Sequence, residues 1–214
     1  MDESTPAHCI AFEGSRRIAS GELKAVAVAV KKIIDQGVTE PVLVFDDKTS
    51  AIVELDLRGT PADVAQRLEQ KPHHDGGQNP PCGAMAEGRR GPGRPRLGVV
   101  AREVTLLPRH WDWLAGQPGG ASVALRKLVE EARRANAGKD RVRQAQEAAY
   151  RFMSAIAGHQ SGFEEATRAL FAGNAARFDE LVQAWPVDVC LHATKLATAA
   201  FEPQPQAHLE GSAE

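Results

Sequence analysis

The sequence has few cysteines, few aromatic residues and no long apolar run. Its three cysteines, Cys9, Cys82 and Cys190, lie far apart without a CxxC pair, so neither a disulfide framework nor a zinc knuckle is supported. No apolar run approaches the roughly 18 to 20 residues needed to cross a bilayer, and the acidic start of the chain lacks the basic and apolar parts of a signal peptide. We therefore expect a soluble cytoplasmic protein with reduced thiols and no membrane partner.

Motifs of the common enzyme classes are also missing. No glycine-rich phosphate loop, GxSxG elbow or HExxH motif occurs, and no cysteine lies in a recognised nucleophile context. His110 lies at an expected helix start, where a surface or interface role is the simpler interpretation. The acidic residues of an expected hairpin favour turn formation and lack the spacing of a cation site. The sequence thus predicts no catalytic residue, no metal site and no cofactor, and it weighs against an enzyme.

The charge that is present is unevenly distributed. The whole chain has a formal net charge of −2, but from Arg89 to Arg143 there are 13 basic against 5 acidic side chains, a net charge of +8. A basic middle between acidic ends permits a local site for a polyanion such as nucleic acid. The alternative is a solvated basic helix surface, which is common in proteins.

The first part of the chain, residues 8–69, predicts a small α+β domain. Short runs of apolar and β-branched residues indicate strands, and apolar residues at helical spacing indicate two helices. Glycine is expected to end the first helix, and Thr60-Pro61 to begin the second. The expected elements are strands over 8–12 and 16–20, a helix over 23–34 ended by Gly37, a strand pair over 41–46 and 52–57, and a helix over 61–68.

Two further regions are defined by composition and periodicity. Residues 70–96 are rich in proline and glycine without a period of 2 or 3.6 residues, which is typical of a flexible linker. Residues 139–201 carry four apolar stripes at helical spacing and predict a C-terminal helical cluster, in which Asn174 caps one helix. Residues 202–214 are expected to be a disordered tail.

The central residues, 97–136, predict one strand and two short helices. Val99–Leu107 is rich in β-branched and apolar residues, Pro108 suits the first turn of a helix, and Gly119-Gly120 separates that helix from a second one. A unit of about 40 residues with a single strand cannot bury both strand edges or enough apolar area alone. We therefore expect a homodimer in which the strand pairs with its copy in a second chain, as a two-stranded ribbon flanked by four helices.

Residues 102–134 resemble the ribbon-helix-helix family of bacterial DNA-binding proteins. The shared features are the strand ending at Leu107-Pro108, the first helix ending at Gly119-Gly120 and a second helix that opens Gly-Ala-Ser-x-Ala-Leu-Arg-Lys-Leu-Val. The resemblance implies that the ribbon enters the major groove and that the helix start grips a DNA phosphate with backbone N–H groups. The residues that would hold DNA here are Arg102, Gly120, Ala121, Ser122, Arg126 and Lys127.

The register of the ribbon leaves two alternatives open. If Leu107 faces the core, Arg102 is the only outward side chain of the strand that can make a bidentate contact with guanine. A one-residue slip would restore an apolar core but direct Glu103 toward the polyanion. Both registers weaken sequence-specific reading, so a ribbon-helix-helix used for dimerisation alone is the competing interpretation.

The segment just before the strand also points to DNA. Its sequence, from Arg89 to Arg96, is Arg-Arg-Gly-Pro-Gly-Arg-Pro-Arg and resembles an AT-hook, an extended basic motif that enters the minor groove of A·T-rich DNA. Pro92 stands where the motif usually has arginine, and a flexible basic linker is the alternative. The residues expected to contact DNA are Arg89, Arg90, Arg94, Pro95 and Arg96.

The full chain is similar to an uncharacterised family of bacterial proteins that carries no known activity, on the runs 99–114 and 149–153. Two functions are therefore weighed. The first is a dimeric DNA-binding protein, either a transcriptional regulator or a nucleoid-associated factor. The second is a non-catalytic dimeric protein-interaction module that does not bind DNA.

Overall fold

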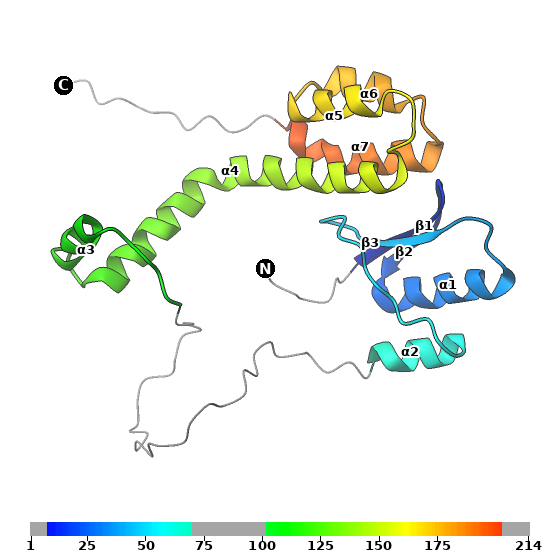
Figure 1. The fold of residues 1–214 in the computed structure, drawn as a ribbon, viewed down its shortest axis with the longest axis horizontal. Helices are drawn as coiled ribbons and strands as arrows, with labels where there is room; N and C mark the ends of the chain where they lie inside the picture. Colours follow the sequence, from blue (N-terminus) through cyan, green and yellow to red (C-terminus); the bar gives the residue numbers. More distant parts are fainter. Residues whose placement is uncertain (1–7, 70–101, 203–214) are drawn as a thin grey trace, which may run out of the picture. The chain divides into compact units, whose positions relative to one another are not determined.

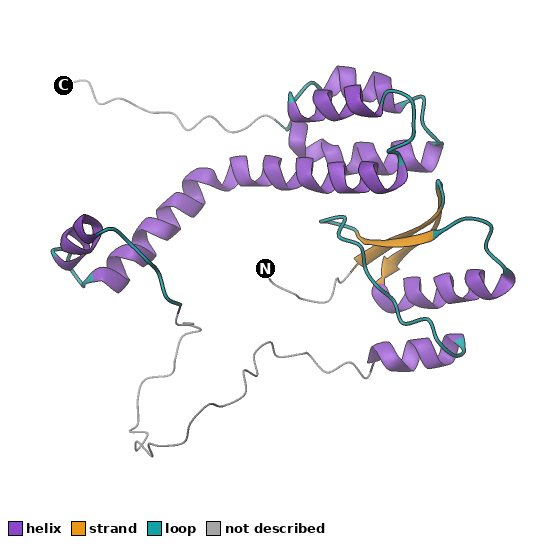
Figure 2. Ribbon diagram, viewed as in Figure 1, coloured by secondary structure: helices purple, strands orange, loops and turns teal. Residues whose placement is uncertain are grey.

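The computed structural model describes residues 8–69 and 102–202, which form a mixed α+β fold that is mostly helical (Figures 1 and 2). They divide into two compact units: unit 1 contains residues 8–69 and 135–202, and unit 2 contains residues 102–134. The elements are β1 (His8–Glu13), β2 (Arg16–Glu22), α1 (Leu23–Gln36), β3 (Val42–Asp46), α2 (Pro61–Glu69), α3 (Pro108–Ala115), α4 (Ala121–Ile156), α5 (Phe163–Phe171), α6 (Ala175–Val182) and α7 (Val187–Phe201).

The sheet of unit 1 is antiparallel, with strand order β2-β1-β3. Successive side chains of β1 point to opposite faces, so Cys9 and Ala11 face one side of the sheet while Ile10 and Phe12 face the other. All four are buried. Both faces of this small sheet are therefore covered, and the predicted β1–β2 hairpin is confirmed.

Helix α1 covers the first face of the sheet (Figure 1). Its buried residues Val26 and Val30 pack with Cys9, Ala11 and Val44 in one apolar cluster. The helix ends at Gly37, whose φ of 92° lies in the left-handed region and whose N–H donates to Ile34 O at 3.1 Å. Helix and cap both match the prediction. Burial raises the pKa of the Cys9 thiol to about 11, with Asp46 and Asp47 adding to the shift, so this free thiol stays protonated.

The second face packs against the C-terminal helices. The Phe152 ring of α4 lies 5.1 Å from Phe12 of β1 and 5.6 Å from Phe45 of β3, measured between ring centroids. The cluster continues through α5, α6 and α7. Residues 8–69 and 139–201, which the sequence suggested as separate domains, thus share one core here, because the sheet needs a cover on its second face.

The predicted strand over 52–57 does not form. Only an isolated bridge joins Ile52 to Phe45, next to a hydrogen bond from Val53 N–H to Val44 O at 2.8 Å. Side chains still alternate along the segment, since residues 53, 55 and 57 are half-buried and residues 52, 54, 56 and 58 are exposed. The alternation that predicted a strand is real, but the backbone leaves β3 after Val53.

The acidic residues of this region serve turns and ion pairs. Asp46 Oδ1 accepts hydrogen bonds from Thr49 N at 2.7 Å, Thr49 Oγ1 at 2.8 Å and Lys48 N at 3.0 Å, as expected of turn chemistry. Asp56 pairs with Arg58, which holds the pKa of that carboxyl well below its usual range. Within residues 8–69 and 102–202, no three histidine, cysteine or acidic side chains form a group suited to a metal ion.

Helices α5, α6 and α7 form where the periodicity predicted helices, and Asn174 caps α6 by accepting a hydrogen bond from Arg177 N at 3.1 Å. One expectation about α4 is wrong. The stripes near 121–132 and 142–156 belong to one helix of 36 residues rather than two. The joining residues contain no proline, and the single Gly138 costs only about 1 kcal/mol in a helix.

Helices long and apolar enough to span a membrane are not found among the described residues. Cys9 is buried and Cys190 half-buried, and both are free thiols. Cys82 lies outside the described residues.

Candidate nucleic-acid interface

Unit 2 contains the two helix starts that the sequence predicted. Pro108 occupies the first turn of α3, where its missing N–H costs nothing. Gly119 and Gly120 have φ values of 85° and 78°, and α4 begins at Ala121. Both glycines lie in the left-handed region, and a Cβ at Gly119 would approach Val123 to 3.2 Å. The short turn between α3 and α4 therefore depends on this glycine pair.

Residues 102–107, which precede α3, form neither helix nor strand in the single chain. Leu107 is extended, with φ −67° and ψ 150°, and the three-stranded sheet does not include this segment. The remaining residues of the expected Val99–Leu107 strand, 99–101, lie outside the described part. A strand that pairs with a second copy has no partner in one chain, so the ribbon stays a prediction.

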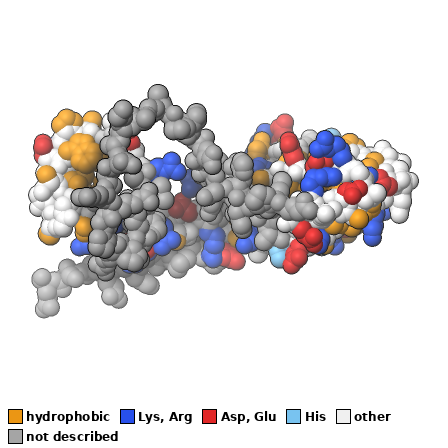
Figure 3. Space-filling view, turned by 90° about the horizontal axis from the view of Figure 1, so that it is seen from below, with side chains coloured by type: hydrophobic (Ala, Val, Ile, Leu, Met, Phe, Trp, Pro, Cys, Tyr) orange, Lys and Arg blue, Asp and Glu red, His pale blue; other side chains and the backbone are white. Residues whose placement is uncertain are grey.

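Unit 2 exposes most of its large apolar side chains. Its buried apolar residues are Leu114 and Ala124, with relative exposures of 2% and 7%. Hydrophobic side chains gather at the surface of unit 2, on the left of Figure 3. Extended exposed apolar surface marks a site of interaction. The exposed large apolar residues, with exposures from 42% to 64%, are Val104, Leu107, Trp111, Trp113, Leu128 and Val129.

The start of α4 offers two open backbone donors. Gly120 N–H donates to Gln117 O at 3.0 Å inside the turn, so it is already engaged. The N–H groups of Ala121 and Ser122 have no hydrogen-bond partner within the described part of the chain. Of the three donors expected to grip a phosphate, these two are available, and the helix dipole adds partial positive charge there.

The basic side chains of unit 2 fall into two groups. Arg133 and Arg134 pair with Glu130 at 3.0 and 3.2 Å, and the Arg133 guanidinium lowers the pKa of that carboxyl. Arg126 Nε donates to Ser122 O at 3.0 Å. Arg102 and Lys127 are exposed and form no ion pair with any described residue. Among the described residues of unit 2, the basic side chains that form no ion pair are therefore Arg102, Arg109, Arg126 and Lys127.

The proposed minor-groove arm cannot be placed. Arg89, Arg90, Arg94, Pro95 and Arg96 all lie outside the described residues. His110 is exposed in the first turn of α3, as expected for a surface residue.

The titratable group that sequence reasoning missed is His192 of α7. It is 3% exposed, lies 4.6 Å from the Phe152 ring, and its Nε2 has no hydrogen-bond partner among the described residues. Burial lowers the pKa of this imidazole to about 4, and the positive charge of Lys195 adds to the shift. His192 therefore acts as a neutral ring of the core. Its position in an apolar stripe was the signal for burial.

Comparison of the sequence with known protein families gives one match. Residues 8–197 match a family described as an uncharacterized protein conserved in bacteria. The match spans both units and most of the chain. No curated protein and no solved structure matches the chain, and none of these comparisons supports the ribbon-helix-helix resemblance.

Proposed function

The chain belongs to the bacterial protein family DUF2239, and we propose that it is a dimeric DNA-binding protein, either a transcriptional regulator or a nucleoid-associated factor. The proposal assigns the ribbon-helix-helix role to residues 97–136 and the function of a basic arm to residues 89–96. Unit 1 would sense or recruit a further component. Nothing in this assignment requires a catalytic group.

The observation that carries the proposal is the exposed apolar surface of unit 2. Six large apolar side chains are 42% to 64% exposed, and an unpaired segment precedes α3. Full burial of one such side chain stabilises by roughly 1.5 to 3 kcal/mol, so covering half of each in two copies contributes several kcal/mol. A second copy of the chain would cover the exposed apolar side chains and pair with the segment before α3, because it supplies an apolar surface and a strand of the same sequence.

Charge supports DNA as the target of that dimer. Residues 89–134 contain 10 basic and 4 acidic side chains, a net charge of +6 for each chain. A dimer doubles this charge and presents two helix starts, each with the open N–H groups of Ala121 and Ser122. Basic arms tethered to such a ribbon raise their own effective concentration at the same duplex.

The second candidate, an interaction module without DNA binding, is favoured by a different observation. The described residues of unit 2, 102–134, have 6 basic and 4 acidic side chains, a net charge of only +2. Two of the six, Arg133 and Arg134, already pair with Glu130. In this interpretation the exposed tryptophans bind protein rather than support a DNA-reading ribbon.

The test combines the mass of the full chain in solution with a duplex titration across salt concentrations. DNA binding predicts a dimer whose affinity falls steeply with salt, and replacing Arg94 and Arg96 together with alanine should reduce the slope by up to about 2. A matched double variant in unit 1, Arg168→Ala with Arg177→Ala, should leave the slope unchanged. A dimer without affinity at low salt supports the interaction module, and a monomer removes both proposals.

A further inference from the structure

One edge of the sheet in unit 1 is only partly covered. Strand β3 is an edge strand. On its outer side, Val44 O accepts a hydrogen bond from Val53 N–H at 2.8 Å, and Asp46 N–H donates one to Ala51 O at 2.9 Å. After Val53 the neighbouring segment leaves β3. The part of this edge near Val42 therefore pairs with no other segment among the described residues.

The backbone groups left open follow from the alternation of a strand. Since Val44 and Asp46 bond outward, Leu43 and Phe45 bond toward β1, and Val42 again faces outward. Val44 N–H and both polar groups of Val42 have no partner among the described residues. These donors and acceptors are two residues apart on one side of a strand, which is the spacing that another extended backbone requires.

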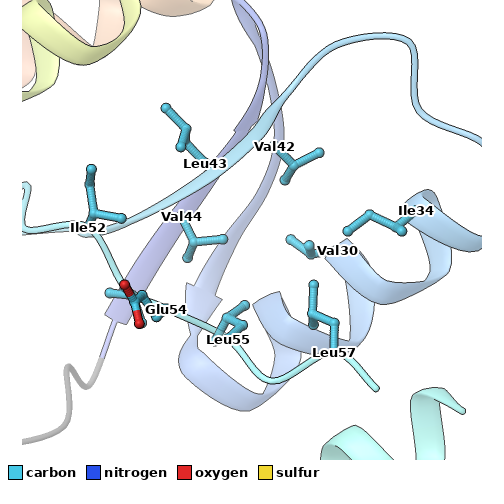
Figure 4. Close-up of a pocket in the computed structure, with 10 residues that line it drawn as sticks. Val30, Ile34, Val42, Leu43, Val44, Ile52, Glu54, Leu55 and Leu57 are labelled. Carbon is cyan, nitrogen blue, oxygen red and sulfur yellow. The ribbon is translucent and has the colours of Figure 1, made fainter. Parts of the chain in front are cut away.

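An apolar groove accompanies the open edge. It has a volume of about 410 Å³ and lies between α1, β3 and the segment that departs from β3 (Figure 4). Val30 and Ile34 of α1 and Leu55 and Leu57 of the segment point into the space beside Val44. Because Leu43 and Ile52 from the opposite face also line it, the groove sits at the edge of the sheet rather than under it.

We propose that this groove is the docking site for an extended aliphatic segment of a partner protein, which adds to β3 as a fourth strand. Its backbone would bond to Val42 and Val44, and its alternate side chains would fill the groove. The lining is aliphatic apart from Glu54, which is exposed and forms no ion pair with a described residue. That carboxylate selects a segment with lysine or arginine on its outer side.

An extended peptide fits these observations better than a small apolar molecule. An aliphatic ligand would fill the groove but leave the polar groups of Val42 and Val44 unbonded and cut off from water, which is costly. A strand satisfies them as it buries apolar surface. The proposal concerns unit 1 only and does not depend on DNA binding by unit 2.

The experiment uses amide hydrogen exchange on the full chain, with a capped seven-residue peptide of alternating valine and lysine as the probe. In the free protein, Leu43 and Phe45 amides should exchange slowly and Val42 and Val44 amides quickly. Saturation with the peptide should slow exchange at Val42 and Val44 by roughly tenfold or more. The same peptide N-methylated at alternate amides should not bind, and replacing its lysines with glutamate should weaken binding about two- to fivefold.

Variants test the groove itself. Ile34→Glu should abolish peptide binding, whereas Val187→Glu, a change at an exposed position of α7, should leave it intact. Slow exchange at Leu43 and Phe45 shows in each case that the sheet has formed. The proposal is overturned if Val42 and Val44 are as protected as their neighbours in the free protein, or if millimolar peptide leaves their exchange unchanged.

Discussion

Units 1 and 2 differ in how much of their apolar surface the chain itself buries. In unit 1 the sheet is covered on both faces, and the rings of Phe12, Phe45 and Phe152 meet in the centre. In unit 2 only Leu114 and Ala124 are buried, while both tryptophans of α3 are 42% and 53% exposed. The contrast indicates that unit 1 is held by its own contacts, whereas the described residues of unit 2 leave most of their large apolar side chains exposed, which is the basis of the proposed dimer.

The largest effect that separates the two units is expected from truncating an aromatic residue in each. Phe152→Ala should lower the free energy of unfolding of unit 1 by about 3 to 5 kcal/mol, because it removes a fully buried ring and leaves a cavity. The matched change Trp113→Ala in unit 2 should lower the free energy of unfolding of unit 1 by less than about 1 kcal/mol, because this ring is 53% exposed and lies outside the core of unit 1. Denaturant unfolding of each variant measures both values, and similar losses would contradict the contrast.

A smaller effect is expected from pH, and it is confined to unit 1. His192 stays neutral in the folded protein down to a pKa of about 4, whereas in the unfolded chain it takes up a proton near pH 6.5. Stability is therefore fully present above pH 6.5 and falls as the pH is lowered toward 4, by roughly 3 kcal/mol. The free energy of unfolding is measured for the chain and for His192→Phe across this pH range. The variant should lose the fall at low pH, and the same pH dependence in both proteins would show that His192 does not cause it.

A still smaller loss is expected at the cap of α6. Asn174→Ala removes the acceptor for Arg177 N–H and should lower the free energy of unfolding by about 1 kcal/mol. Asn174→Asp retains the acceptor and should cost only a few tenths. Thermal unfolding of the two variants gives the difference, and equal losses would show that the cap contributes nothing to unit 1.

Local structure was predictable from the sequence where a single element decides it. The hairpin of β1 and β2, the end of α1 at Gly37, and the helix starts at Pro108 and Ala121 all follow from turn residues and apolar spacing. The contact between Phe45 and Phe152 does not, because periodicity shows which face of an element is buried but not what covers it. The same limit explains why the sequence predicts separate domains for the sheet and the C-terminal helices, which share one core.

The candidate sites were predictable to different degrees. The sequence identified the start of α4 with its open N–H groups, although Gly120 N–H turned out to bond within the turn. The groove beside β3 was missed. Its signal in the sequence is the alternation of Val53, Leu55 and Leu57, which predicts a strand. Where a strand separates from its neighbour depends on packing against α1, and no local pattern encodes that point.

The shared core of unit 1 also constrains the order of events during synthesis. Phe45 and the Phe152 that covers it are more than a hundred residues apart in the chain. At a translation rate of about 10 residues per second, the sheet emerges from the ribosome roughly ten seconds before its cover. During that interval the nascent chain exposes the aromatic face of the sheet that Phe152 later covers.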